Sequence, residues 1–209
     1  MSSEGSGLVG FSLRVAPIVA ALGLMACESP VNDDQITCLG GEQPGVPTSA
    51  FHRPGQPCIV CHGDYQGDKP IMAVAGTIFA TPSNPVPVEG VRVRLTDSAG
   101  STKDATTNCI GNWWIDSDAW MPTFPLRAEI VCPSTAPDDP DQPPRRLVMG
   151  TRITRDGSCA GCHIGPPAQD SPGWIFCGKT MPQPPYRVKD SCQGLASGEL
   201  PGLPPGKCK

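Results

Sequence analysis

The sequence predicts a mainly β protein, with a small antiparallel β-sandwich flanked by two short segments and by irregular loops that disulfides hold in place. Three observations support this fold class. Of the 209 residues, 26 are proline and 24 are glycine, which excludes long helices. Short runs in the middle of the chain alternate apolar and polar residues, which is the period of a half-buried strand. Eleven cysteines in a chain with only 5% aromatic residues indicate an exported protein whose disulfides supplement a modest core.

Four strands are expected between residues 71 and 132, over 73–80, 90–96, 111–116 and 126–132. The second shows the alternation most clearly, in the run GVRVRLT. The next four residues, Asp-Ser-Ala-Gly, are typical of a hairpin turn in which Gly100 supplies a positive φ. Asn108 and Gly111 bracket a second turn. The pattern therefore predicts antiparallel strands joined by tight turns.

The first 26 residues are expected to be a signal peptide. Residues 15–26 are an apolar run of about a dozen residues, too short to span a bilayer as a helix. The end of this run, Leu24-Met25-Ala26-Cys27, resembles the lipobox of bacterial lipoproteins. The resemblance implies that Cys27 is diacylated and becomes the first residue of a membrane-anchored chain, and Glu28 after it implies sorting to the outer membrane. An ordinary signal peptide, in which Cys27 has no role, is the alternative.

Two five-residue motifs carry the chemistry. They are Cys58-Ile59-Val60-Cys61-His62 and Cys159-Ala160-Gly161-Cys162-His163, and both match C-x-x-C-H, the attachment signature of c-type haem. On one helical turn the two cysteines can each form a thioether to the same porphyrin, and the histidine then lies under the iron. Only three histidines occur in the chain, and two of them stand directly after a C-x-x-C pair. The motifs therefore predict two haem c groups with His62 and His163 as iron ligands.

Two other readings of the cysteine pairs remain open. The four motif cysteines could hold a zinc ion, although zinc sites normally pair their halves over a shorter gap. A C-x-x-C pair could also be a redox dithiol of thioredoxin type, which needs a preceding strand. Gln56-Pro57 before the first pair and Gly157-Ser158 before the second do not indicate such a strand.

The remaining iron ligands can be narrowed by counting. Two haems with two histidines each would need four histidines, and the chain has three, so at least one haem takes another ligand. His52, six residues before Cys58, is a candidate for the open face of its own haem or of the neighbouring one, and a surface histidine or a hydrogen-bond donor to a propionate is the alternative. Methionine is the usual alternative ligand, and Met149, ten residues before Cys159, is the favoured candidate, followed by Met181.

The other cysteines are expected to form disulfides. With Cys27 and the four motif cysteines set aside, six remain, namely Cys38, Cys109, Cys132, Cys177, Cys192 and Cys208. Six cysteines suit three disulfides but allow 15 pairings.

Residues 71–132 resemble the carboxypeptidase regulatory-like, transthyretin-type β-sandwich module. The resemblance rests on the runs AGTIF at 75–79, VPVEGVRV at 86–93 and TTNCIGNW at 106–113. It implies a module that binds or spaces and does not catalyse. Cys109, inside a turn of this pattern, is expected to pair with Cys132 as a strand-to-strand bridge.

The whole chain is similar to exported dihaem cytochrome lipoproteins in which two attachment sites flank such a module. The organisation expected is a signal peptide (1–26), a tether without a convincing helix (27–50), a first haem segment (51–70), the sandwich (71–150) and a second haem segment with a disulfide-pinned tail (151–209). The resemblance implies electron transfer between redox partner proteins, with the two motifs brought together at one pole of the sandwich.

Two further functions remain as alternatives to the electron relay. One is a peroxidase-like reductase with an open iron, and the other is a surface binding module that carries haem. A formal net charge of −4 gives no basic footprint for nucleic acid.

Overall fold

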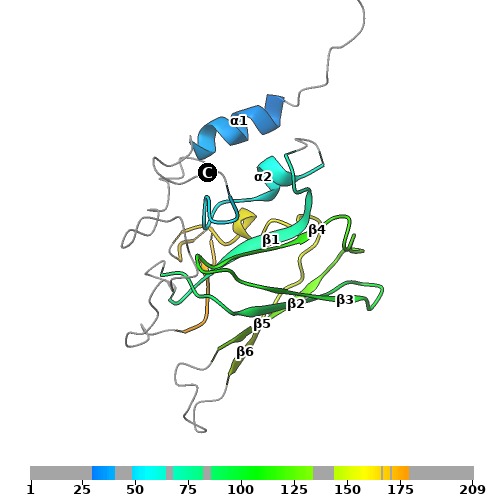
Figure 1. The fold of residues 1–209 in the computed structure, drawn as a ribbon, viewed down its shortest axis with the longest axis vertical. Coiled ribbons are helices and arrows are strands. Elements are labelled where there is room, and N and C mark those ends of the chain that lie inside the picture. The colour runs from blue at the N-terminus through cyan, green and yellow to red at the C-terminus, as the bar shows by residue number, and fades with distance from the viewer. Residues whose placement is uncertain are drawn as a thin grey trace, which may run out of the picture.

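The computed structural model describes residues 30–40, 49–64, 68–81, 86–133, 144–165, 167–169 and 171–178. Within these ranges the protein is mainly β, with two packed sheets and short helices to one side (Figure 1). The helices are α1 (Pro30–Leu39), α2 (Ile59–His62) and the 3-10 turn η1 (Cys159–Gly161). The strands are β1 (Met72–Phe79), β2 (Arg92–Thr96), β3 (Thr102–Thr106), β4 (Asn112–Asp116), β5 (Arg127–Cys132), β6 (Arg145–Val148) and β7 (Ile175–Phe176). The predicted fold class is confirmed.

The first sheet has the order β4-β1-β7, and the second has the order β3-β2-β5-β6. Strand β1 pairs with β4 in antiparallel register, with Thr77 opposite Asn112. On its other side β1 pairs with the short β7 in parallel, with Ile78 opposite Ile175. Strand β1 is therefore the central strand of this sheet, and its backbone is hydrogen-bonded to a neighbouring strand on each side.

Apolar side chains from both sheets form the core. On β1 the inward residues include Val74 and Ile78, and on β2 they include Val93 and Leu95, all at most 1% exposed. Burying a side chain of this size stabilises the fold by about 1.5–3 kcal/mol. A disulfide between Cys132 and Cys177 joins the end of β5 to the segment after β7, and both cysteines belong to this core.

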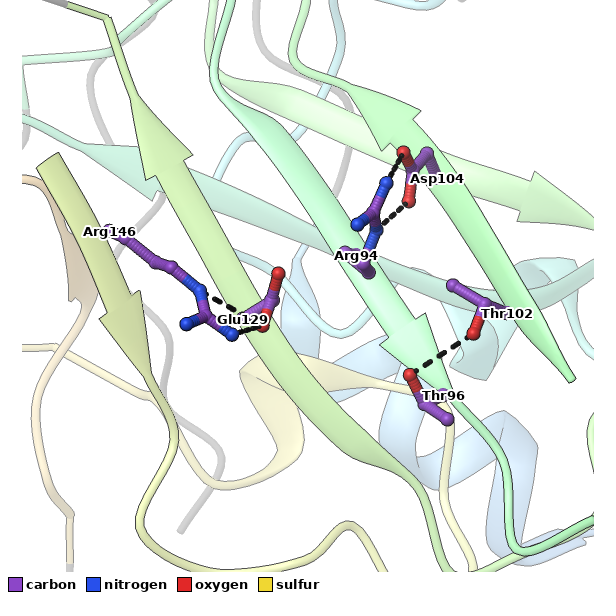
Figure 2. A network of polar contacts seen from close by, with 6 residues as sticks. All are labelled: Arg94, Thr96, Thr102, Asp104, Glu129 and Arg146. Carbon is purple, nitrogen blue, oxygen red and sulfur yellow. Dashed lines mark hydrogen bonds and ion pairs between the residues drawn. The ribbon is translucent and has the colours of Figure 1, made fainter. Parts of the chain in front are cut away.

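The outward face of the second sheet is polar, as Figure 2 shows. Arg94 on β2 makes two hydrogen bonds of 2.8 Å to Asp104 on β3. Arg146 on β6 pairs with Glu129 on β5, and Thr96 contacts Thr102. Such exposed pairs contribute little to stability. This face is the solvent side of the sandwich, and the two C-x-x-C-H motifs lie with the other sheet.

The four expected strands correspond to β1, β2, β4 and β5, and both expected turns form. Gly100 has φ +86° and Gly111 has φ +78°, so each uses the left-handed conformation that favours glycine. The sequence analysis did not identify strands β3, β6 and β7. Strand β3 is a half-exposed edge strand, and its run TKDAT carries a single apolar residue, Ala105. The run therefore shows no clear alternation of apolar and polar residues.

Two expectations are wrong. Residues 27–50 are not only a tether, because residues 30–39 form helix α1. Proline at the first helical position, Asp33 in the first turn and Gly40 at φ +79° just after the end are typical helix boundaries. The pairing of Cys109 with Cys132 is also wrong, since Cys132 bonds to Cys177. Cys109 lies in the turn before β4, beside Ile110 and Phe51 and outside the main core, and it is in a different disulfide.

Several predicted features lie outside the described residues. They are the signal peptide, the lipidation site Cys27, the candidate ligand Met181, and Cys192 and Cys208. In the part of the chain that the structure describes, none of the helices has the length and apolar character needed to cross a membrane.

Candidate functional site

The two C-x-x-C-H motifs pack on the same strand. Helix α2 of the first motif and turn η1 of the second both contact β1 (Figure 1). The backbone N–H of Ala75 donates to the carbonyl of Gly157, just before the second motif, at 2.9 Å. The N–H of Gly55, just before the first motif, donates to the side-chain oxygen of Thr77 at 2.8 Å. Neighbouring residues of β1 therefore anchor two segments that are far apart in the sequence.

Each motif forms one helical turn, as the spacing of its cysteines predicts. The N–H of His62 donates to the carbonyl of Cys58 at 2.9 Å, and the N–H of His163 donates to the carbonyl of Cys159 at 2.9 Å. The same bond at the same length closes both turns. In each motif the two cysteines therefore start and nearly complete a single turn, with the histidine directly after them.

Both motif histidines are oriented in the same way. Nδ1 of His62 lies 3.2 Å from the carbonyl oxygen of Asp68 and 3.1 Å from that of Pro70. Nδ1 of His163 lies 2.8 Å from the carbonyl oxygen of Gly173. A carbonyl oxygen only accepts, so Nδ1 carries the hydrogen in each ring, and the neutral ring keeps the lone pair on Nε2. This is the arrangement by which proteins orient a histidine that binds metal through Nε2.

Close backbone approach explains how the second motif reaches β1. A Cβ placed on Gly157 would lie 2.0 Å from the carbonyl oxygen of Ala73. A Cβ placed on Gly76 would lie 2.9 Å from Cβ of Cys159 and 3.2 Å from its sulfur. Only glycine at these two positions lets turn η1 lie directly on the strand.

We expect Gly157→Ala to displace the second motif and to destabilise the protein by about 1–3 kcal/mol, because the new methyl group meets a fixed backbone carbonyl. Gly150→Ala is the control, since a Cβ there meets nothing within 4 Å and its φ is not positive. Urea unfolding measures both variants. Equal midpoints for the two variants would contradict this account of the packing.

The first cysteine of each motif is half-buried. Burial raises the pKa of Cys58 to about 11. Burial also raises the pKa of Cys159, to about 12, and the charge of a nearby Cys58 thiolate contributes to this increase. Both thiols are therefore neutral at physiological pH.

Within the described residues, the cysteines outside the two motifs are in disulfides. Cys132 and Cys177 bond to each other, and Cys38 and Cys109 are also in disulfides. The described cysteines outside any disulfide are the four of the two motifs, Cys58, Cys61, Cys159 and Cys162. The motif sulfurs are therefore the ones left for other chemistry.

His52 lies beside the first motif. Its ring centroid is 5.8 Å from that of His62, and the rings are tilted by 49°. Two imidazoles that bind one metal ion from opposite sides, each nitrogen about 2 Å from the metal, have ring centres about 6 Å apart. Nδ1 of His52 contacts the carbonyl of Ser49, so Nε2 keeps its lone pair here too. The structure therefore brings together the first motif and its predicted second ligand.

Met149 is not placed beside either motif. It follows β6, which in the described residues packs only beside β5 at the edge of the second sheet. A cleft of about 660 Å³ instead lies between the motifs, lined by Ile59 and Gly63 on one side and by Ser158 and Gly161 on the other. Two methionines that the sequence analysis did not favour, Met72 and Met121, line this cleft.

The surroundings of Cys159 contain polar atoms without partners. Nε1 of Trp113 and Oγ of Ser158 are buried and have no hydrogen-bond partner among the described residues. Trp113 is 2% exposed and Ser158 is 6% exposed. Buried polar groups are normally satisfied, so these two are compatible with a further group bound at the second motif.

No family model matches the chain, and no curated protein or solved structure matches it either. The site therefore rests on the motifs and on their geometry. The sequence analysis missed Thr77, Asn112 and the cleft methionines as parts of the site. A threonine and an asparagine on predicted strands give no signal until the register of β1 and β4 places them opposite each other.

Proposed function

We propose that this chain is a dihaem c-type cytochrome that passes electrons between redox partner proteins. One observation carries the proposal. Two C-x-x-C-H motifs from distant parts of the chain form the same helical turn against the same strand. In each motif, Nδ1 of the histidine contacts a backbone carbonyl, which leaves the lone pair of Nε2 available to a metal. A structural role alone does not require this repetition.

The residues present fit the cofactor. Cys58 and Cys61 would hold one porphyrin by thioethers and Cys159 and Cys162 the other, with His62 and His163 as iron ligands. When bound, haem iron supplies a one-electron redox couple, and the protein positions it and sets its potential.

The other readings of the cysteines are less well supported. A tetrahedral zinc site needs four ligands grouped around one ion. In the described ranges no three side chains of His, Cys, Asp or Glu are grouped to hold a metal ion. This donor set suits two separate porphyrins better than one tetrahedral ion.

The two motifs pack on the same strand and line one cleft, which favours a relay. Haems attached at these two motifs would lie close together, and electrons pass readily between close haems. The sandwich would then act as the spacer that fixes the distance between them. We also propose, from the lipobox alone, that Cys27 anchors the protein at the outer membrane.

Absorption spectra of the oxidised and dithionite-reduced protein, with and without carbon monoxide, test the function. A relay with six-coordinate irons gives low-spin spectra that carbon monoxide does not change. A rapid shift with carbon monoxide would favour a peroxidase-like reductase with an open iron and would contradict the relay.

The second iron needs a sixth ligand, and two methionines are candidates. Met149 is the one that the sequence favours, and Met121 lines the cleft between the motifs and is 63% exposed. Methionine ligation gives a weak band at the red end of the oxidised spectrum. We expect Met121→Ala or Met149→Ala to abolish this band, and Met72→Ala serves as a comparison. If the band is absent from the wild type, neither methionine is the ligand.

A further inference from the structure

Two buried polar residues of the first sheet, Thr77 and Asn112, hold the segment that carries His52 against β1 and β4. We call this pair the clip. Thr77 on β1 and Asn112 on β4 stand opposite each other in the sheet register. They are 5% and 8% exposed. The hydroxyl of Thr77 donates to Oδ1 of Asn112 at 2.7 Å.

This pair holds the backbone on both sides of His52. Nδ2 of Asn112 donates to the carbonyl of His52 at 3.0 Å and to that of Ala50 at 3.4 Å. The N–H of Gly55 donates to the hydroxyl of Thr77 at 2.8 Å. The chain is therefore fixed before, at and after the histidine, and the two side chains use their donors and acceptors for this purpose.

The backbone of the clipped segment is strained. Arg53, directly after His52, has φ +50°, which non-glycine residues rarely adopt. Its guanidinium donates to Oε1 of Gln56 and to the carbonyl of Gly40. Strain of this kind persists where surrounding contacts over-determine the conformation, and it concentrates at functional sites.

The clip has a consequence for the ring. The imidazole of His52 lies 5.8 Å from that of His62. His52 precedes helix α2 by several residues, so the geometry of that helix alone does not fix this distance. The clip holds the backbone carbonyl of His52, and the contact of Nδ1 with the carbonyl of Ser49 orients the ring.

We propose that Thr77 and Asn112 are positioning residues that hold His52 as the second ligand of the first haem iron. This inference rests on the proposed function. Neither residue would contact the haem. Both would act on ligation through the backbone of the segment that carries His52. Without the clip, the segment relaxes from its strained conformation and His52 leaves the iron for part of the time.

The test uses the full-length protein made with the haem-attachment machinery. Thr77→Val removes the hydroxyl and leaves both Gly55 N–H and Asn112 Oδ1 unsatisfied. Thr77→Ser keeps the hydroxyl. Asn112→Asp still accepts from Thr77 but no longer donates to the carbonyls of Ala50 and His52. Thr96→Val is the matched control, because it removes the hydroxyl that contacts Thr102 on the outer face of the second sheet.

The His52→Ala variant provides the reference for a first haem with an open face. It is expected to react with carbon monoxide and to give a high-spin ferric spectrum. We expect Thr77→Val and Asn112→Asp to raise the carbon monoxide-reactive fraction about tenfold, as for loss of a buried hydrogen bond. Thr77→Ser and Thr96→Val should match the wild type. Urea unfolding of the same variants separates this effect from general destabilisation, which does not change the spectrum of the folded protein.

The outcomes separate the two claims. If the wild type carries no haem, the proposed function fails. If all variants carry two haems and Thr77→Val and Asn112→Asp remain unreactive toward carbon monoxide, the positioning role is wrong while the proposed function stands. If His52→Ala leaves both irons closed, His52 is not a ligand and the inference is overturned.

Discussion

Replacing both Cys58 and Cys61 with alanine is expected to leave a protein that carries one haem where the wild type carries two. Replacing Cys159 and Cys162 should do the same for the second site, because each pair supplies both thioethers of its own porphyrin. The haem absorbance per polypeptide should fall by about half in each variant, and removal of all four cysteines should abolish it. The measurement is the ratio of haem absorbance in pyridine to protein concentration.

A variant that removes two cysteines elsewhere controls for the loss of cysteine itself. Cys132→Ala with Cys177→Ala takes away a disulfide and leaves both motifs unchanged, so it should keep two haems per chain. Unchanged haem content in the double variants of either motif would contradict the assignment of that motif.

The same disulfide variant is expected to have the largest effect on stability. Cys132 and Cys177 are 45 residues apart in the sequence. In the chain-entropy model, closing a loop of this length stabilises the folded state by about 4 kcal/mol. This is a large fraction of the 5–15 kcal/mol that holds a typical domain together.

The loss of stability should extend to the loop that orients His163, while covalent attachment of both haems is retained. The bond holds the chain that follows β7, and Cys177 N–H donates to the carbonyl of Phe79 on β1 at 3.0 Å. The loop that orients His163 through Gly173 comes just before β7. Urea unfolding of the oxidised protein gives the free energy directly. A loss below about 1 kcal/mol would mean that core packing alone holds this segment.

The sequence predicted the sandwich because its signal is local. Alternation in the run GVRVRLT and the glycines at positions 100 and 111 fix β2 and two turns without reference to the rest of the chain. Edge strands gave no such signal, since β3 is half exposed and β7 has two residues. Helix α1 has boundary signals in Pro30 and Gly40, but its sequence PVNDDQITCL is polar and shows no clear apolar face, so periodicity does not indicate it.

The local turns of the candidate site were predictable from the sequence, but its tertiary arrangement was not. The spacing of the two motifs predicts a helical turn each, and both turns form. The pairing of disulfides depends on which strand ends meet in the folded chain, and the sequence does not give this information. The expected bond between Cys109 and Cys132 is wrong, since Cys132 bonds to Cys177. The contact between Gly157 and Ala73 likewise depends on tertiary packing. Position along the chain does not fix where a ligand candidate lies in space, since His52 lies beside His62 whereas Met149 follows an edge strand of the other sheet.

The mass of the intact chain, purified after co-expression with the haem-attachment machinery, tests the central claim most directly. The account predicts a polypeptide heavier by two covalently bound haems, with peptides that contain Cys58–Cys61 and Cys159–Cys162 each carrying one of them. A chain that shows no added mass under conditions in which a known c-type cytochrome is fully modified would contradict it.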